Sequence, residues 1–352
     1  MRVLVTGGAG FIGSHYVRQL LDGVYPAFAG AEVTVLDKLT YAATEENLRP
    51  VADRPGLRFV HGDICDPALV AEVMDGADVV VHFAAESHVD RSIAGASDFV
   101  LTNVAGTNTL LHAAVAAGVS KFVHVSTDEV YGSIEDGSWP EEHPLDPNSP
   151  YSASKAGSDL LARAYHRTHG LPVCVTRCSN NYGPYQHPEK MIPLFVTNLL
   201  NGEPVPLYGD GGNVRDWLHV TDHCRGIQLV AESGVPGEVY NIGGGTELTN
   251  RELTGKLLDA VDADWSMVRR VADRKGHDRR YSVAYDKISS ELGYVPVVDF
   301  TEGLDETVRW YRDNREWWEP LKSSAVEASA ASSAATRSAA ARSPVTRTRG
   351  TS

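Results

Sequence analysis

The sequence has no run of about 18 or more apolar residues, which is the shortest stretch that typically spans a membrane as a helix. Its amino terminus has one arginine and a short apolar stretch that runs directly into glycines, without the cleavage-site pattern of a secretory signal. We therefore expect neither a membrane span nor export.

Cysteine is scarce. Cys65, Cys174, Cys178 and Cys224 are too few and too scattered for a disulfide framework. Cys174 and Cys178 lie in a Val/Thr-rich, strand-like stretch, which does not suit a pair of metal ligands. We expect free thiols, no bound metal and a reducing, cytoplasmic compartment.

Positive charge is also in deficit, since the formal net charge is −14. This balance argues against general nucleic-acid binding and gives no long-range attraction for an anionic substrate. If the substrate has phosphates, local cations and backbone N–H groups must bind them.

Within this acidic chain, strand-like and helix-like segments alternate over the first 180 residues, which predicts a Rossmann-type, doubly wound parallel α/β sheet. The expected strands are Arg2–Thr6, Glu32–Asp37, Leu57–His61, Val79–Phe83, Lys121–Ser126 and Pro172–Arg177. The expected helices lie near Phe11–Leu21, Pro67–Met74, Ala96–Ala117 and Ser152–His169.

The composition divides the chain into three parts. We expect residues 1–178 to bind a dinucleotide, and residues 179–322 to form a smaller α/β region that mainly binds substrate, with some segments returning to the main sheet. Residues 323–352 are almost entirely Ala, Ser, Thr and Arg, so we expect a disordered tail.

A glycine-rich turn follows the first strand. Gly7, Gly10 and Gly13 have the spacing G-x-x-G-x-x-G, which lets the backbone approach a pyrophosphate at the start of a helix. Asp37 ends the next strand and can accept hydrogen bonds from an adenosine ribose diol, while its charge disfavours a 2′-phosphate. The pattern predicts NAD rather than NADP. Asp63 and Ile64, after the third strand, are candidates to flank the adenine.

Two groups of residues suit oxidation followed by elimination. Tyr151 and Lys155 stand four apart on one helical face, and we expect Lys155 and a positive nicotinamide ring to lower the pKa of the Tyr151 phenol. Thr127, Asp128 and Glu129 follow an apolar strand, at the end where doubly wound sheets bind ligands. One carboxylate there can remove a C–H proton while one carboxylic acid protonates a leaving hydroxyl.

From Met1 to about Lys322, the chain resembles TDP-glucose 4,6-dehydratases of the extended short-chain dehydrogenase/reductase superfamily. The matching blocks are Gly7–Gly13, Asp37–Ala42, His82–Asp90, Ser126–Tyr131, Tyr151–Lys155, Arg177–Tyr185, Pro188–Lys190 and Arg215–Trp217, with Arg274–Asp278 matching in part. Related epimerases usually lack the Thr-Asp-Glu block, and GDP-mannose dehydratases tend to have Ser at the position of Asp128. Dehydratases that act on UDP-glucose share the block, so it does not distinguish a thymine nucleotide from a uracil nucleotide in the substrate.

The resemblance implies a redox-neutral cycle on TDP-glucose. Tyr151 takes the 4-hydroxyl proton while the C4 hydride passes to NAD, and Thr127 places the sugar. Glu129 then removes the C5 proton, Asp128 protonates the departing C6 hydroxyl, and the hydride returns to C6. The product is a 4-keto-6-deoxy sugar nucleotide.

The motifs and the resemblance together give two further sets of residues. Cofactor contacts are expected from Gly7, Gly10, Phe11, Ile12, Gly13, Asp37, Lys38, Leu39, Thr40, Asp63, Ile64, Phe83, Ala84, Ala85, Ser87, Thr102, Tyr151 and Lys155. Substrate contacts are expected from Ser87, Thr127, Asn180, Glu189, Lys190, Pro206, Tyr208, Arg215, Asn250, Arg274, His277 and Tyr281.

A homodimer is also implied, in which the helices near Ala96–Ala117 and Ser152–His169 form a four-helix bundle with their mates. The chain departs from the family at Ala43-Thr44, where Gly-Asn is usual, and at Lys275, where many relatives have proline. Two alternatives stay open: a UDP-sugar dehydratase, epimerase or decarboxylase of the same superfamily, and a NAD-binding protein without catalysis.

Overall fold

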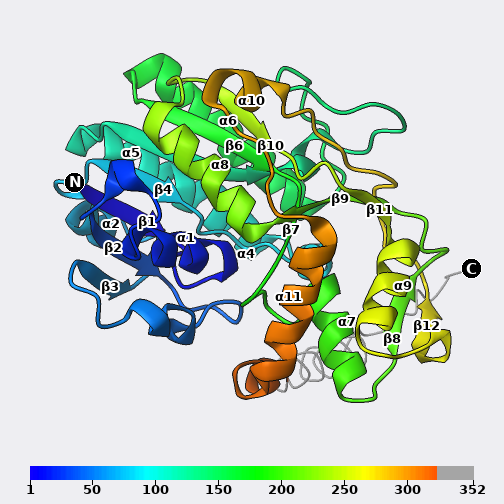
Figure 1. Ribbon diagram of the computed structural model, residues 1–352. Helices are drawn as coiled ribbons and strands as arrows, with labels where there is room; N and C mark the ends of the chain where they lie inside the picture. Colours follow the sequence, from blue (N-terminus) through cyan, green and yellow to red (C-terminus); the bar gives the residue numbers. More distant parts are fainter. Residues whose placement is uncertain (323–352) are drawn as a thin grey trace, which may run out of the picture.

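The computed structural model describes residues 1–322, and the expected tail at 323–352 lies outside the described residues. A parallel sheet of seven strands forms the centre of the molecule (Figure 1). Its strands, in spatial order, are β10 (Val239–Ile242), β6 (Val173–Cys178), β5 (Lys121–Thr127), β4 (Val79–His82), β1 (Arg2–Thr6), β2 (Glu32–Asp37) and β3 (Leu57–His61). The order reverses direction at β1, so a crevice opens beyond the carboxyl ends of β1 and β4, where such sheets bind ligands.

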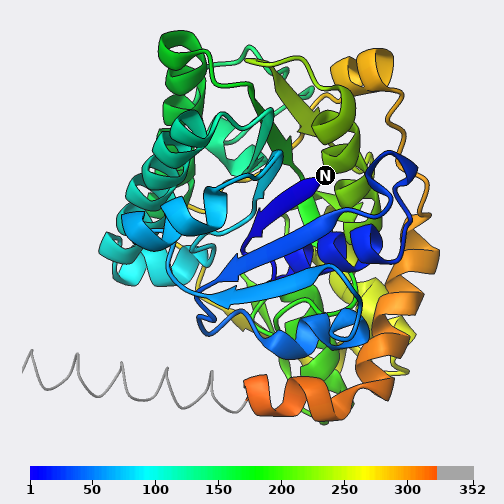
Figure 2. The ribbon, with the colours of Figure 1, turned by 90° about the vertical axis from the view of Figure 1, so that its left-hand side faces the viewer.

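Helices cover both faces of this sheet (Figure 2). One layer contains α2 (Pro67–Met74), α5 (Thr107–Ala117) and α6 (Pro150–His169), and the other contains α1 (Phe11–Leu21), α8 (Val220–Ser233) and α10 (Asp286–Leu292). Alternation along the strands explains the two layers, because Val3 and Val5 face α1 and α8 while Leu4 faces α2 and α5.

The expected boundaries of the strands and helices agree with the structure to within two residues, except in the segment from Ala96 to Ala117. There the chain forms α4 (Ser97–Phe99), a π-helical turn η3 (Val100–Gly106) and then α5. The wider turn includes Thr102, which lines the main cavity, and Asn103, whose amide bonds the backbone of Glu86 and the Ser154 hydroxyl. Single π turns of this kind are frequent at functional sites.

Residues after Cys178 build a smaller part beside the carboxyl ends of the main strands (Figure 1). It has a three-stranded sheet in the order β11 (Glu247–Thr249), β9 (Val214–His219) and β7 (Asn180–Tyr182), and a pair formed by β12 (Val268–Val271) and β8 (Val205–Tyr208). Helices α7 (Met191–Leu200), α9 (Asn250–Ala260) and α11 (Phe300–Asp313) pack around a separate apolar cluster.

The remaining elements are short. They are η1 (Pro26–Phe28), η2 (Glu45–Val51), α3 (Val89–Ala94), η4 (Asp128–Tyr131) and η5 (Trp265–Met267). The region after residue 178 also returns to the main sheet, because β10 pairs with β6 and α8 packs on the same core as α1. Among the described residues, no helix is long and apolar enough to cross a membrane.

Candidate active site

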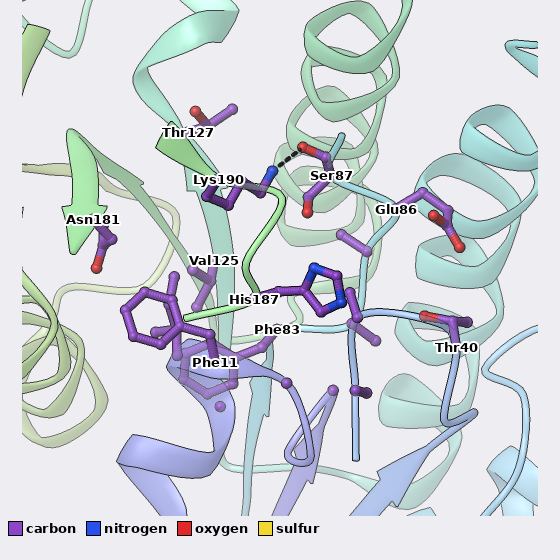
Figure 3. Close-up of a pocket in the computed structure, with 18 of the residues that line it drawn as sticks. Phe11, Thr40, Phe83, Glu86, Ser87, Val125, Thr127, Asn181, His187 and Lys190 are labelled. Atoms are coloured by element: carbon purple, nitrogen blue, oxygen red, sulfur yellow. Dashed lines mark hydrogen bonds between the residues drawn. The ribbon is translucent and has the colours of Figure 1, made fainter. Parts of the chain in front are cut away.

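A cavity of about 350 Å³ lies at the carboxyl ends of the central strands. Most of the expected cofactor residues line it: Gly7, Gly10, Phe11, Ile12, Gly13, Asp37, Lys38, Thr40, Asp63, Ile64, Phe83, Ala84, Ala85, Ser87, Thr102, Tyr151 and Lys155. Figure 3 shows Phe11 of α1, Phe83 after β4, Val125 and Thr127 of β5, and Lys190 before α7 around it.

The glycines of the first turn fit a dinucleotide. Gly7 has φ +71°, and a Cβ on it would stand 2.5 Å from the Ala84 nitrogen. A Cβ on Gly13 would stand 2.2 Å from the Gly7 oxygen, so neither position accepts a side chain. A Cβ on Gly10 would have only the Gly7 oxygen near it, at 3.4 Å, and would occupy the space that a pyrophosphate needs. The first turn of α1 has no side-chain cap, which leaves its N–H groups available to an anion.

The carboxylate of Asp37 has two hydrogen-bond donors in the protein backbone, in addition to any ribose that it would bind. It accepts hydrogen bonds from the Ala9 nitrogen at 2.9 Å and from the Leu39 nitrogen at 2.8 Å. Burial raises the pKa of Asp37, and these backbone donors act in the opposite direction. Leu39, an expected cofactor residue, does not line the cavity, because its side chain packs on the apolar core.

The departure at Ala43-Thr44 is accommodated without strain. Ala43 is not among the described residues with positive φ, and its nitrogen donates to the Thr40 oxygen at 3.0 Å. The Thr44 hydroxyl accepts from the Glu46 nitrogen at the start of η2. This loop therefore reaches its conformation without the glycine that relatives usually have. Lys275, the other departure, is exposed.

Tyr151 and Lys155 lie on the first turns of α6. A capping box formed by Ser149 and Ser152 stabilises the amino terminus of this helix. The Lys155 ammonium donates to the Val125 oxygen at 2.8 Å. Burial lowers the pKa of Lys155 to about 8, against the opposing charges of Asp159 and Cys178.

The lowered pKa expected for Tyr151 beside Lys155 and a bound nicotinamide ring stays a prediction, and the protein groups alone act in the opposite direction. Burial raises the pKa of Tyr151 well above its ordinary value, and the nearby Glu129, Cys178 and Asp128 raise it further. A hydrogen bond with Thr127 is the one effect that lowers it. The sequence placed the cation four residues away but did not reveal how completely the phenol is buried, nor that two carboxyls face it.

Asp128 and Glu129 begin η4, directly after β5; Asp128 is buried and Glu129 is partly buried. Burial, Glu129 and Asp216 raise the pKa of Asp128 well above its usual range. Burial also raises the pKa of Glu129, but Arg215, Lys190 and Arg274 act against that rise. The two adjacent carboxyls therefore differ in their electrostatic surroundings. Those of Asp128 favour its protonated form, while Glu129 faces three cations.

Five residues of the expected substrate set line the same cavity: Ser87, Thr127, Asn180, Glu189 and Lys190. The Lys190 ammonium donates to the Ser87 oxygen at 2.8 Å (Figure 3). Glu189 is buried between Arg91, at 3.5 Å, and His88, at 3.7 Å. The buried Asn180 side-chain oxygen has no hydrogen-bond partner among the described residues.

The other expected substrate residues do not line this cavity: Pro206, Tyr208, Arg215, Asn250, Arg274, His277 and Tyr281. Five of them, all except Pro206 and Asn250, form two groups of contacting side chains. Arg215 stacks on the Tyr281 ring at 4.3 Å, Arg274 lies 5.5 Å from the Tyr208 ring, and that ring meets His277 edge-on. The influence of Arg215 and Arg274 on Glu129 places this cluster next to the acid–base pair.

The structure also adds residues that the sequence did not single out. Glu86, Asn181, Gln186 and His187 line the cavity, and all four lie in or beside motifs that were recognised only as blocks. Arg177 and Asp159 form a buried ion pair at 2.9 Å behind it, and Arg177 also donates to the Tyr131 hydroxyl. No group of three His, Cys, Asp or Glu side chains within residues 1–322 could hold a metal ion.

Comparisons with known proteins agree with this geometry. Residues 4–307 match the family described as GDP-mannose 4,6 dehydratase. The chain is 66% identical over 323 residues to a dTDP-glucose 4,6-dehydratase from Streptomyces antibioticus, covering 92% of this chain and 96% of that one. A second relative of the same name, from Streptomyces niveus, is 62% identical over the same lengths.

A solved structure shares the fold throughout. The dTDP-glucose 4,6-dehydratase from Streptomyces venezuelae, crystallised with NAD and TYD bound, superposes with a TM-score of 0.91. It is 70% identical, and the match covers 91% of this chain and all of that one.

Proposed function

The chain belongs to the GDP-mannose 4,6-dehydratase family, and we infer that it dehydrates dTDP-glucose to dTDP-4-keto-6-deoxyglucose in a cycle that uses and regenerates NAD. It is a hydro-lyase of nucleotide-sugar metabolism with a Rossmann-type fold. In this proposal, residues 1–178 bind the cofactor and residues 179–322 mainly bind the substrate.

The observation that supports elimination most directly is the difference between Asp128 and Glu129. An elimination needs an acid that is protonated and a base that is ionised at the same pH. Asp128 is buried beside Glu129 and Asp216, which favour its protonated form more than Arg215 opposes it, while Lys190, Arg215 and Arg274 favour the ionised form of Glu129. We assign Asp128 to protonate the C6 hydroxyl as it leaves, and Glu129 to remove the C5 proton.

Tyr151, Lys155 and Thr127 serve the oxidation at C4. Tyr151 removes the proton of the 4-hydroxyl, Thr127 supplies the hydrogen bond that favours its phenolate, and Lys155 supplies the nearby cation. NAD, when bound, accepts the hydride from C4 and returns it to C6. The ketone formed at C4 makes the C5 proton acidic enough for Glu129 to remove.

The cofactor and nucleotide have separate sets of residues. Gly7 to Gly13 suit the pyrophosphate of NAD, and the carboxylate of Asp37 suits the adenosine ribose. For the substrate we assign Lys190, Arg215 and Arg274 to the diphosphate or nucleoside, since these cations adjoin Glu129. The aromatic and polar neighbours Pro206, Tyr208, Asn250, His277 and Tyr281 complete that set.

A homodimer fits the exposed face of the α5–α6 layer. Val100, Leu101 and Leu160 are 54%, 53% and 55% exposed, and an apolar depression between Ala96 and Leu161 runs past them. Burial of these side chains against a second copy explains their position. We also propose a cytoplasmic location, which the four free cysteines support.

Isotope transfer tests the assignment. dTDP-glucose and UDP-glucose, each with deuterium at C4, are supplied in parallel and the products analysed by NMR and mass spectrometry. We expect deuterium at C6 of a 4-keto-6-deoxy product, with dTDP-glucose reacting faster. A C4 epimer as product would contradict the elimination. A faster reaction with UDP-glucose would contradict the assignment of the nucleotide.

A further inference from the structure

A chain of hydrogen bonds joins the carboxyl-terminal segment to the glycine-rich turn. The indole N–H of Trp317 donates to Oδ1 of Asn47 at 2.9 Å, and Nδ2 of Asn47 donates to the Ala9 oxygen at 2.8 Å. Asn47 lies in η2 and is 1% exposed. In Figure 2 the orange segment after α11 lies beneath the blue η2.

The direction of each bond is set by chemistry. An indole N–H can only donate, so the Asn47 amide must turn its oxygen toward Trp317 and its NH₂ group toward Ala9. The Ala9 carbonyl can only accept, so both partners require the same orientation of the Asn47 amide. The indole N–H of Trp317 therefore reinforces the position of a side chain that holds the middle of the turn.

Ala9 is the centre of that turn, and both of its peptide groups are held. Its nitrogen donates to Asp37, and its oxygen accepts from Asn47 and, at 3.3 Å, from the Thr44 nitrogen. The next peptide nitrogen, of Gly10, donates to the Gly7 oxygen at 3.2 Å. With these peptides fixed, the N–H groups at the start of α1 point into the cavity, where a pyrophosphate binds.

Trp317 is itself held in place by an aromatic cluster. Its ring lies 5.0 Å from Trp310 and 5.6 Å from Tyr185, and Arg18 of α1 stacks on Tyr185 at 4.3 Å. Arg18 also donates to the Asn47 backbone oxygen at 2.5 Å. The cluster thus connects α11, the loop before Lys190 and α1 at one point.

We propose that Trp317 is a positioning residue for the dinucleotide, and that through Asn47 it clamps the Gly7–Gly13 turn and slows the release of NAD. The proposal rests on the cofactor assignment above. A cycle that regenerates its NAD at each turnover gains from slow release, because a cofactor lost midway leaves an oxidised sugar behind.

The test compares Trp317→Phe with Trp318→Phe. Phenylalanine keeps one aromatic ring and removes the indole N–H together with part of the ring volume, a loss of volume that the control variant shares. Trp318 is the matched control, because it is fully buried and its indole donates at 2.7 Å to the Tyr311 oxygen, away from the turn. Each protein is loaded with NAD, chased with an excess of a fluorescent NAD analogue, and followed for NAD release. Thermal melting is measured on the same samples.

We expect Trp317→Phe to release NAD about five-fold faster than wild type, which is the effect of one lost hydrogen bond. Trp318→Phe should release NAD at the wild-type rate even where its melting temperature falls as far or further. Equal release from wild type and Trp317→Phe would overturn the clamp, and so would equally fast release from Trp318→Phe.

A double variant tests the route through Asn47. If Trp317 acts through that amide, Trp317→Phe should add nothing to the faster release of Asn47→Ala. Additive effects would overturn the route. If Asn47→Ala does not fold, the two tryptophan variants still decide the proposal. A wild-type protein that does not bind NAD in any of these assays would overturn the cofactor assignment itself.

Discussion

Asp128 and Glu129 are chemically similar and adjacent, yet the residues around them differ in charge, which supports the different roles that we propose for them. The charges around the two residues differ in sign. Neighbouring carboxyls raise the pKa of Asp128, while three cations oppose the rise that burial causes in the pKa of Glu129. An enzyme that must both donate and accept a proton gains from this difference, since it favours the protonated form of one carboxyl and the ionised form of the other.

Replacing Glu129 with Gln should stop the cycle after oxidation. The amide cannot take the C5 proton, so steady-state turnover should fall at least about 100-fold while the C4 hydride is still transferred. Single-turnover absorbance would show reduced cofactor accumulating instead of returning to baseline. Glu135→Gln, at an exposed position six residues on, is the control. Normal turnover by Glu129→Gln would refute its role as the base.

Lys155→Met should make the protein more stable and inactive. The pKa of Lys155 is about 8 when folded and about 10.5 when unfolded, so below pH 8 folding must bury a charge. Methionine avoids that cost, and we expect a gain of about 1–3 kcal/mol at pH 7. Because wild type itself gains stability as pH rises from 8 toward 10.5, the advantage should shrink over that range.

Urea titrations at pH 7.0 and 9.5 measure this effect. Lys256→Met, on the exposed face of α9, controls for the loss of a surface charge. A destabilised Lys155→Met protein at pH 7 would show that the hydrogen bond to Val125 outweighs the buried charge.

At the scale of elements, the helices of the α5–α6 layer have two faces with different neighbours. Leu110, Leu111 and Ala114 of α5 are buried against the sheet, while Val100 and Leu101 in the preceding π turn are exposed. The π turn changes which side chains face outward, since each added residue rotates the following turn. The sequence showed an apolar helix here but could not separate burial in the sheet from burial in a partner.

Leu101→Glu should therefore convert the proposed dimer to monomers. A carboxylate at the centre of an apolar interface would lose its hydration without gaining a partner. Light scattering should give half the wild-type mass, with thermal melting still cooperative. Val297→Glu places the same charge at an equally exposed apolar position elsewhere and should leave the mass unchanged. A dimeric mass for Leu101→Glu would refute this interface.

The sequence predicted the elements of the main sheet well because long apolar strands and glycine punctuation have strong patterns. It could not predict the sheet of β7, β9 and β11, because β7 and β11 are three residues long and each of the three strands comes from a different stretch of chain. The residues expected to bind the cofactor came from one contiguous motif per loop, and most of them line one cavity. Gln186 and His187 were not singled out, since their contact with the cavity depends on how the loop before Lys190 folds back.

At the scale of the whole molecule, the expected cofactor-binding region is not a separate core. Ile227, Val230 and Ile242 are fully buried in the same apolar cluster as Val3, Val5 and Val17 of residues 1–178. Strand β10 also covers the edge of β6. Removing the chain after Cys178 would therefore expose one face of the sheet as well as its edge.

A fragment of residues 1–178 should not melt cooperatively or retain NAD. The apolar surface that α8 covers would be exposed to water at a cost of about 25 cal/mol per Å². Circular dichroism melts and dye binding to exposed apolar surface would report the loss, with residues 1–322 as the control that should melt as one unit. A cooperative melt by the shorter fragment would refute this reading of the core.

The two bonds that Asp37 makes to the backbone also bear on how this protein can evolve. A mutation that removes the carboxylate to admit a 2′-phosphate would also release the Ala9 and Leu39 nitrogens, and Leu39 already adopts φ +52°. A first step toward a different cofactor that removes both acceptor oxygens therefore also loosens the turn that we assign to the dinucleotide. A change of nicotinamide cofactor should therefore need a second substitution that supplies new partners for the Ala9 and Leu39 nitrogens.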